Sequence, residues 1–150
     1  MKLLFLDFDG VLHPSGGAPG TCLPFEWLPT LVELLEPAPD VFLAVHSSWR
    51  EVHAMEYLRD FLGPLGNRLV GAVPSGSKSN AILAFLGEHQ EVWDYLILDD
   101  SPAEFSSELR ARLLVCSPLL GIQDSEIQLA LKAWLDLSGG HDFADCHARC

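Results

Sequence analysis

The chain has 150 residues, of which 49% are hydrophobic, and carries 21 Asp and Glu against 9 Lys and Arg, a net charge of −12. This length and composition predict one globular domain with its own core and exclude a disordered chain. The charge disfavours non-specific binding of nucleic acid through a broad basic surface, and leaves open a small basic patch.

Targeting signals and cysteine usage point to the cytoplasm. No apolar run reaches the 18 residues that span a bilayer, and Asp7 and Asp9 interrupt the N-terminal apolar run too early for a signal peptide. Four cysteines without an export signal are typical of reduced thiols. We therefore expect a soluble, cytoplasmic protein that does not bind membranes.

The predicted elements alternate between apolar strands and amphipathic helices. A buried strand over residues 2–6 is followed by a Gly- and Pro-rich loop over 14–24 and a helix over 26–36. The next elements are a strand over 41–45, a helix over 49–62 with Val52, Met55, Leu58, Phe61 and Leu62 facing inward, and a strand over 69–73. A helix over 79–88, strands over 95–98 and 112–116, and a helix over 125–137 complete the series.

This alternation predicts an α/β protein, a three-layer Rossmann-like fold with a five-stranded parallel sheet, over residues 1–137. Residues 138–150 hold His141, Cys146, His147 and Cys150 without a familiar zinc spacing. We expect this segment to be a poorly ordered tail.

Two acidic pairs follow predicted strands. Asp7 and Asp9 follow the first strand, and alternate residues of extended backbone point to the same side, so these carboxylates converge. Asp99 and Asp100 follow the strand over 95–98, which Pro102 ends. In open α/β sheets ligands bind at the carboxyl ends of the strands, so up to four carboxylates meet there and favour Mg²⁺.

Hydroxyl and basic side chains are expected near the same edge. Ser47 and Ser48 follow the second strand, where a helix cap is the alternative role, and Arg50 either holds a phosphate or is solvated. Lys78 comes directly after Ser77, a natural N-cap. A cation in a first helical turn suits an anion-binding site, with an ordinary surface lysine as the alternative.

The segment Asp7-Phe8-Asp9-Gly10-Val11-Leu12 resembles the first motif of the haloacid dehalogenase-like (HAD) superfamily, a buried strand ending in Asp-x-Asp-Gly-x-Leu/Thr. Residues 41–47 resemble its second motif, a strand followed by Ser or Thr. Lys78 matches the third motif by position, and Asp99-Asp100 match the fourth.

The resemblance implies a Mg²⁺-dependent phosphatase that forms an aspartyl-phosphate. Asp7 is then the nucleophile, and Asp9 is the acid for the leaving group and afterwards the base for water. Ser47, with Ser48 as a weaker candidate, hydrogen-bonds the phosphoryl group, and Lys78 neutralises charge. The implied metal ligands are Asp7, the Asp9 backbone carbonyl and Asp100, supported by Asp99.

The chain looks like a capless member of the superfamily, because residues 11–40 and 50–77 leave no room for an inserted cap domain. Capless members have open sites and act on large phosphorylated substrates or borrow a lid from a partner. The Ser47-Ser48-Trp49-Arg50 turn is similar to that of small phosphatase modules of RNA-repair proteins. The charge of −12 opposes that substrate class, so nucleic acid is expected only as a phosphorylated end. The oligomeric state stays open.

Two other classes of protein remain as alternatives. A signalling receiver domain also forms an aspartyl-phosphate on a five-stranded sheet, but its phosphoacceptor follows the third strand, where this chain has Gly71-Ala72-Val73-Pro74 and no Asp. A catalytically silent metal-binding module that serves as a docking surface is the second alternative.

Overall fold

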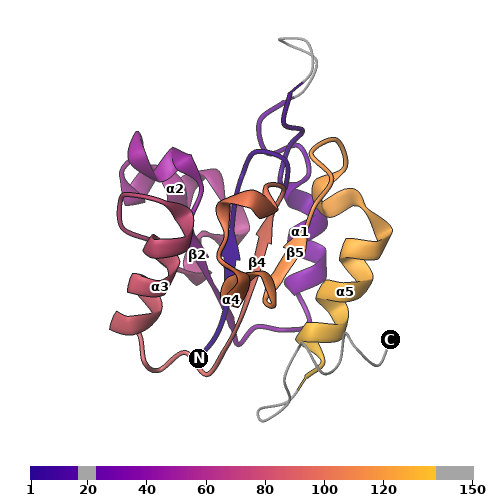
Figure 1. The fold of residues 1–150 in the computed structure, drawn as a ribbon. Helices are drawn as coiled ribbons and strands as arrows, with labels where there is room; N and C mark the ends of the chain where they lie inside the picture. The colour runs from indigo at the N-terminus through magenta and orange to yellow at the C-terminus, as the bar shows by residue number, and fades with distance from the viewer. Residues whose placement is uncertain (17–22, 138–150) are drawn as a thin grey trace.

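A computed structural model of the protein describes residues 1–16 and 23–137. One parallel sheet forms its centre, in the order β3-β2-β1-β4-β5 (Figure 1). The strands are β1 (Lys2–Leu6), β2 (Val41–Val45), β3 (Leu69–Ala72), β4 (Asp94–Asp99) and β5 (Leu113–Val115). The predicted five-stranded parallel α/β fold is confirmed. The expected tail over 138–150 lies outside the described residues.

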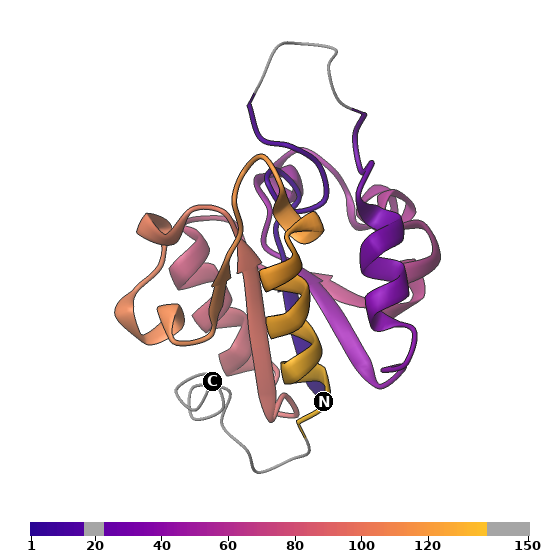
Figure 2. The same ribbon diagram turned by 90° about the vertical axis from the view of Figure 1, so that its right-hand side faces the viewer.

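The central strand β1 is buried on both faces because it pairs with β2 on one side and β4 on the other. Its alternate residues enter two separate cores. Leu4 and Leu6 pack with residues of the helices α1 (Leu28–Leu35), α2 (Met55–Phe61) and α5 (Ser125–Leu135). Leu3 and Phe5 pack on the opposite face with α3 (Lys78–Glu88) and α4 (Ser107–Arg110). The result is the three-layer arrangement seen in Figure 2.

Side-chain caps fix the starts of α3 and α5. The Ser77 hydroxyl accepts a hydrogen bond from the backbone N–H of Asn80, so α3 begins at Lys78. Asp124 caps α5 in the same way through the N–H of Glu126. The expected N-cap role of Ser77 is thereby confirmed.

The predicted helix over 49–62 is wrong in its first half. A 3₁₀ turn, Ser48–Glu51, comes first, and Ala54 is extended before α2 starts at Met55. The turn forms because Ser47 Oγ accepts from the Trp49 N–H. Val52, expected to face inward, is 76% exposed. The sequence also gave no sign of α4, a single turn capped by Ser106.

The connections that could hold a cap domain are those before and after β2. The described residues between β1 and β2 form only α1, and those between β2 and β3 form α2 with the 3₁₀ turns Ser48–Glu51 and Gly63–Arg68. Within the described ranges there is thus no separate cap over the carboxyl edge of the sheet, as predicted. No helix in that part of the chain has the length and apolar character needed to cross a membrane.

Candidate active site

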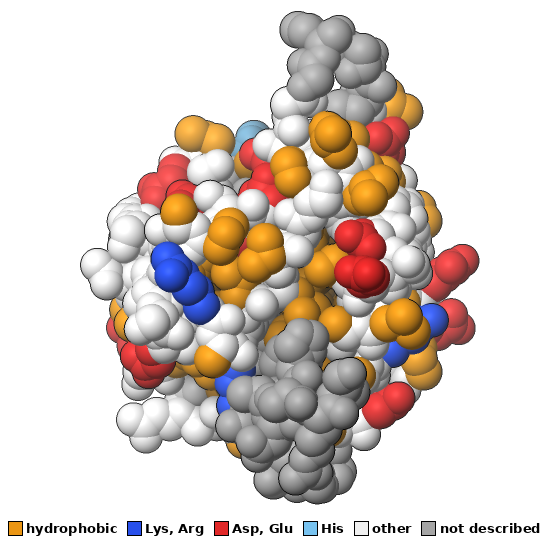
Figure 3. All heavy atoms as spheres, turned by 45° about the vertical axis from the view of Figure 1, so that its right-hand side comes forward, with side chains coloured by type: hydrophobic (Ala, Val, Ile, Leu, Met, Phe, Trp, Pro, Cys, Tyr) orange, Lys and Arg blue, Asp and Glu red, His pale blue; other side chains and the backbone are white. Residues whose placement is uncertain are grey.

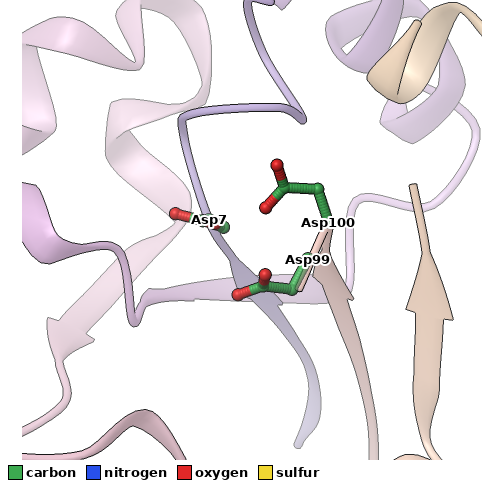
Figure 4. A group of neighbouring side chains, drawn as sticks. All are labelled: Asp7, Asp99 and Asp100. Atoms are coloured by element: carbon green, nitrogen blue, oxygen red, sulfur yellow. The ribbon is translucent and has the colours of Figure 1, made fainter. Parts of the chain in front are cut away.

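Three carboxylates converge at the carboxyl edge of the sheet. Asp7 directly follows β1, Asp99 is the last residue of β4, and Asp100 follows it. Each offers an oxygen within 4.8 Å of the others, and Figure 4 shows the three side chains close together at the ends of β1 and β4. Asp7 and Asp99 are buried, with 3% and 0% of their surface exposed. The predicted meeting of the first and fourth motifs therefore occurs.

Lys78 bridges these acids from the first turn of α3. Its Nζ lies 3.2 Å from Asp7 Oδ2, 2.9 Å from Asp99 Oδ2 and 3.1 Å from Glu104 Oε2. Burial lowers the pKa of the ammonium, but the charges of Asp7 and Asp99 outweigh burial, and the pKa is raised. Lys78 is therefore a permanent cation beside the predicted nucleophile.

Asp7, Asp99 and Asp100 carry more negative charge than Lys78 can neutralise, so the cluster favours a bound cation. Burial, followed by the charge of Asp99, raises the pKa of Asp7 to about 6 against the opposing effects of His46 and Lys78. Burial and Asp99 also raise the pKa of Asp100. These three acids offer only oxygen ligands, the set that Mg²⁺ prefers. The residues present thus fit a magnesium ion.

Asp9 does not join this cluster through its side chain. Its Oδ1 lies 2.7 Å from His13 Nε2, and its Oδ2 accepts a hydrogen bond of 3.2 Å from Trp49 Nε1. Of the four predicted carboxylates, three gather within 4.8 Å in the described chain, and the Asp9 carboxylate is turned to other partners. Metal binding by the Asp9 backbone carbonyl stays a prediction.

The end of β2 contributes His46 and Ser47, both fully buried. His46 Nε2 lies 2.8 Å from Asp99 Oδ2. Burial lowers the pKa of His46 to about 3, so the neutral ring donates this hydrogen bond. The Ser47 hydroxyl caps the 3₁₀ turn, and Ser48 is exposed. Their expected roles on a phosphoryl group stay predictions.

Backbone carbonyls engage the Arg50 guanidinium, and the Arg50 side chain is 4% exposed. Its guanidinium donates to the backbone carbonyls of His46, Ser47, Pro74 and Gly76. These bonds join the turn after β2 to the loop that leads into Lys78. The proposed contact of Arg50 with a substrate phosphate gains no support from this arrangement.

The sequence did not single out His13, His46 or Trp49 as site residues. His13 stands four positions after Asp9, and Trp49 lies within the turn that carried the RNA-repair resemblance. The one sequence feature that points to His46 is its position, as a polar residue between an apolar strand and Ser47. The fold shows that all three donate to, or lie beside, acids of the predicted site.

This parallel sheet, with an Asp-x-Asp segment after its central strand and an acidic pair at the end of β4, defines a capless HAD-like domain, a phosphatase-type hydrolase. The family model of the HAD domain in Swiss Army Knife RNA repair proteins matches residues 3–127, and the chain belongs to that family. No curated protein and no solved structure matches the chain.

The topology excludes the receiver alternative. Receiver domains have the strand order 2-1-3-4-5, whereas this sheet runs β3-β2-β1-β4-β5. Its third strand, Leu69–Ala72, lies at an edge and has no acidic residue.

Proposed function

We propose that the protein is a Mg²⁺-dependent phosphatase that hydrolyses a phosphomonoester through an aspartyl-phosphate on Asp7. The observation that carries this proposal is the convergence of Asp7, Asp99 and Asp100 within 4.8 Å, with Lys78 Nζ bonded to the first two. A buried carboxylate beside a fixed cation and a metal-binding set suits attack on an anionic phosphoryl group.

The reaction has two displacements at phosphorus. An Asp7 carboxylate oxygen forms a bond to phosphorus as the bond to the leaving oxygen breaks, and Asp9 protonates that leaving oxygen. Asp9 then takes a proton from water, which attacks phosphorus and releases Asp7. Lys78 neutralises charge on the phosphoryl oxygens, and the Ser47 hydroxyl orients them. Mg²⁺, held by Asp7, Asp100 and the Asp9 carbonyl with Asp99 in support, would lower the negative charge that the nucleophile meets.

A phosphorylated nucleic-acid end is the substrate class we propose first. In the described residues no separate cap covers this edge of the sheet, and the family model that matches residues 3–127 is that of the HAD domain in RNA repair proteins. Acidic side chains are spread over the described part of the face shown in Figure 3, in keeping with the net charge of −12. Such a surface suits recognition of one terminal phosphate better than of a long backbone.

The test is release of phosphate from p-nitrophenyl phosphate with Mg²⁺ or with EDTA. We expect turnover only with Mg²⁺, and a fall in kcat of at least about a hundredfold in Asp7→Asn and Asp9→Asn. Asp60→Asn, an exposed acid of α2, is the matched control. An inactive wild type that a small phosphodonor labels stably would instead support a catalytically silent docking module.

A further inference from the structure

We infer that His13 and Trp49 are positioning residues that hold the Asp9 carboxylate for proton transfer, an inference that rests on the proposed function. Their two ring N–H groups engage both carboxylate oxygens, Oδ1 at 2.7 Å and Oδ2 at 3.2 Å. The Asp9 side chain is 46% exposed, so little packing restrains it. Two hydrogen bonds in different directions fix a side chain that solvent would otherwise leave free to rotate.

The orientation of His13 is itself fixed by the backbone. The N–H of Phe25 donates to His13 Nδ1 at 3.0 Å, so that nitrogen carries a lone pair. The ring proton is therefore on Nε2, and His13 donates to Asp9. His13 is 5% exposed, and burial keeps its ring in this position.

Aromatic packing holds the Trp49 indole, whose Nε1–H is the second donor to Asp9. The Trp49 ring makes edge-to-face contacts with Phe8 and Phe25, with centroids 5.6 Å and 5.2 Å away. Phe25 also packs edge-to-face on His13 at 5.2 Å. The φ angle of Phe25 is +60°, a left-handed conformation that is strained in a residue with a side chain. The surrounding rings and the bond to His13 offset this strain.

Proton transfer needs the acid within hydrogen-bond reach of the leaving oxygen. An alkoxide leaves only if it is protonated, whereas p-nitrophenolate leaves without a proton. Loss of Asp9 positioning must therefore slow alkyl phosphates more than aryl phosphates. A purely structural role of His13 and Trp49 would instead lower both rates equally.

The experiment compares kcat/KM for p-nitrophenyl phosphate and for glycerol 2-phosphate, because kcat/KM reports the step that transfers phosphoryl to Asp7. Trp49→Phe removes the N–H and keeps an aromatic ring, with Trp93→Phe as control, a residue 53% exposed. His13→Leu removes the other donor, and His13→Gln restores an amide N–H. We expect Trp49→Phe and His13→Leu to lose at least about tenfold more kcat/KM on the alkyl than on the aryl phosphate.

Asp9→Asn supplies the reference for this selectivity. We expect the same preference for the aryl substrate in Asp9→Asn, and no further selective loss when His13→Leu is added to it, because both changes act through one group. His13→Gln should recover part of the alkyl activity. Equal losses on both substrates in the His13 and Trp49 variants, with Asp9→Asn still selective, would overturn the inference and leave the phosphatase intact. A wild type without turnover on either substrate would overturn both.

Discussion

Asp100 occupies the space that a side chain on Gly10 would need. A Cβ on Gly10 would lie 2.2 Å from Asp100 Oδ2, and the φ angle of Gly10 is +77°. The turn after β1 and the loop after β4 therefore touch directly at the candidate metal site. Only glycine combines this backbone conformation with this close approach.

Replacing Gly10 with alanine should damage the site as well as the fold. We expect Gly10→Ala to lose about 1–3 kcal/mol of unfolding free energy from the backbone strain alone. The displaced Asp100 should lower phosphatase kcat/KM at least about tenfold. Urea unfolding and phosphate release measure the two effects. Gly16→Ala is the matched control, because Gly16 has a φ of +90° and no atom within 4 Å of its would-be Cβ. Equal activity losses in both variants would show that the contact with Asp100 is irrelevant.

Magnesium should stabilise the folded protein. Asp7 and Asp99 are buried like charges, and Asp100 lies with them inside 4.8 Å, so a bound cation relieves their repulsion. At a hundred times its Kd, Mg²⁺ should raise the unfolding free energy by about 2.7 kcal/mol. Urea unfolding with Mg²⁺ and with EDTA measures this difference.

Two variants distinguish Mg²⁺ binding at the candidate site from Mg²⁺ binding at surface acids. Asp100→Asn should lose most of the Mg²⁺ effect, while Asp60→Asn on the exposed face of α2 should keep it. A wild type whose unfolding curve does not move with Mg²⁺ would contradict the assignment of these acids as metal ligands.

The strands and the meeting of the acids could be predicted because they depend on local patterns. Largely apolar runs of four or five residues predicted β1 to β4 with each boundary within one residue, and the carboxyl ends of parallel strands share one edge. The placement of Asp7, Asp99 and Asp100 follows from that geometry.

The partners of Asp9 could not be predicted in this way. Its bond to Trp49 joins residues 40 positions apart, and depends on how the turn after β2 folds. That turn was expected to be α-helical, and its actual 3₁₀ form arises from one competing hydrogen bond to Ser47. The direction of a side chain within a turn depends on tertiary contacts, and the hydrophobic periodicity of the sequence does not predict those contacts.

Arg50 should support the site rather than bind substrate. Its guanidinium donates to the carbonyls of His46 and Ser47 on one loop and of Pro74 and Gly76 on another. Lysine cannot reproduce this fork of donors. We expect Arg50→Lys to lose about 1–3 kcal/mol of unfolding free energy and to lower kcat, with KM changed less than about twofold. Steady-state kinetics and urea unfolding measure these values. A large rise in KM with full stability would instead return Arg50 to the role of phosphate ligand.

His46 should make the protein less stable in acid. Because burial lowers the pKa of His46 from 6.5 to about 3, the unfolded chain binds one more proton than the folded one between these values. The contribution of His46 to the unfolding free energy is therefore complete above pH 6.5. It decreases by about 1.4 kcal/mol for each pH unit as the pH falls from 6.5 toward 3. In His46→Gln this contribution is absent, while the amide can still donate to Asp99. We expect the loss of unfolding free energy between pH 7 and pH 5, measured with urea in EDTA, to be about 2 kcal/mol smaller in His46→Gln than in the wild type. Parallel pH curves for the two proteins would show that the pKa of His46 is the same in the folded and unfolded chains, and would contradict this prediction.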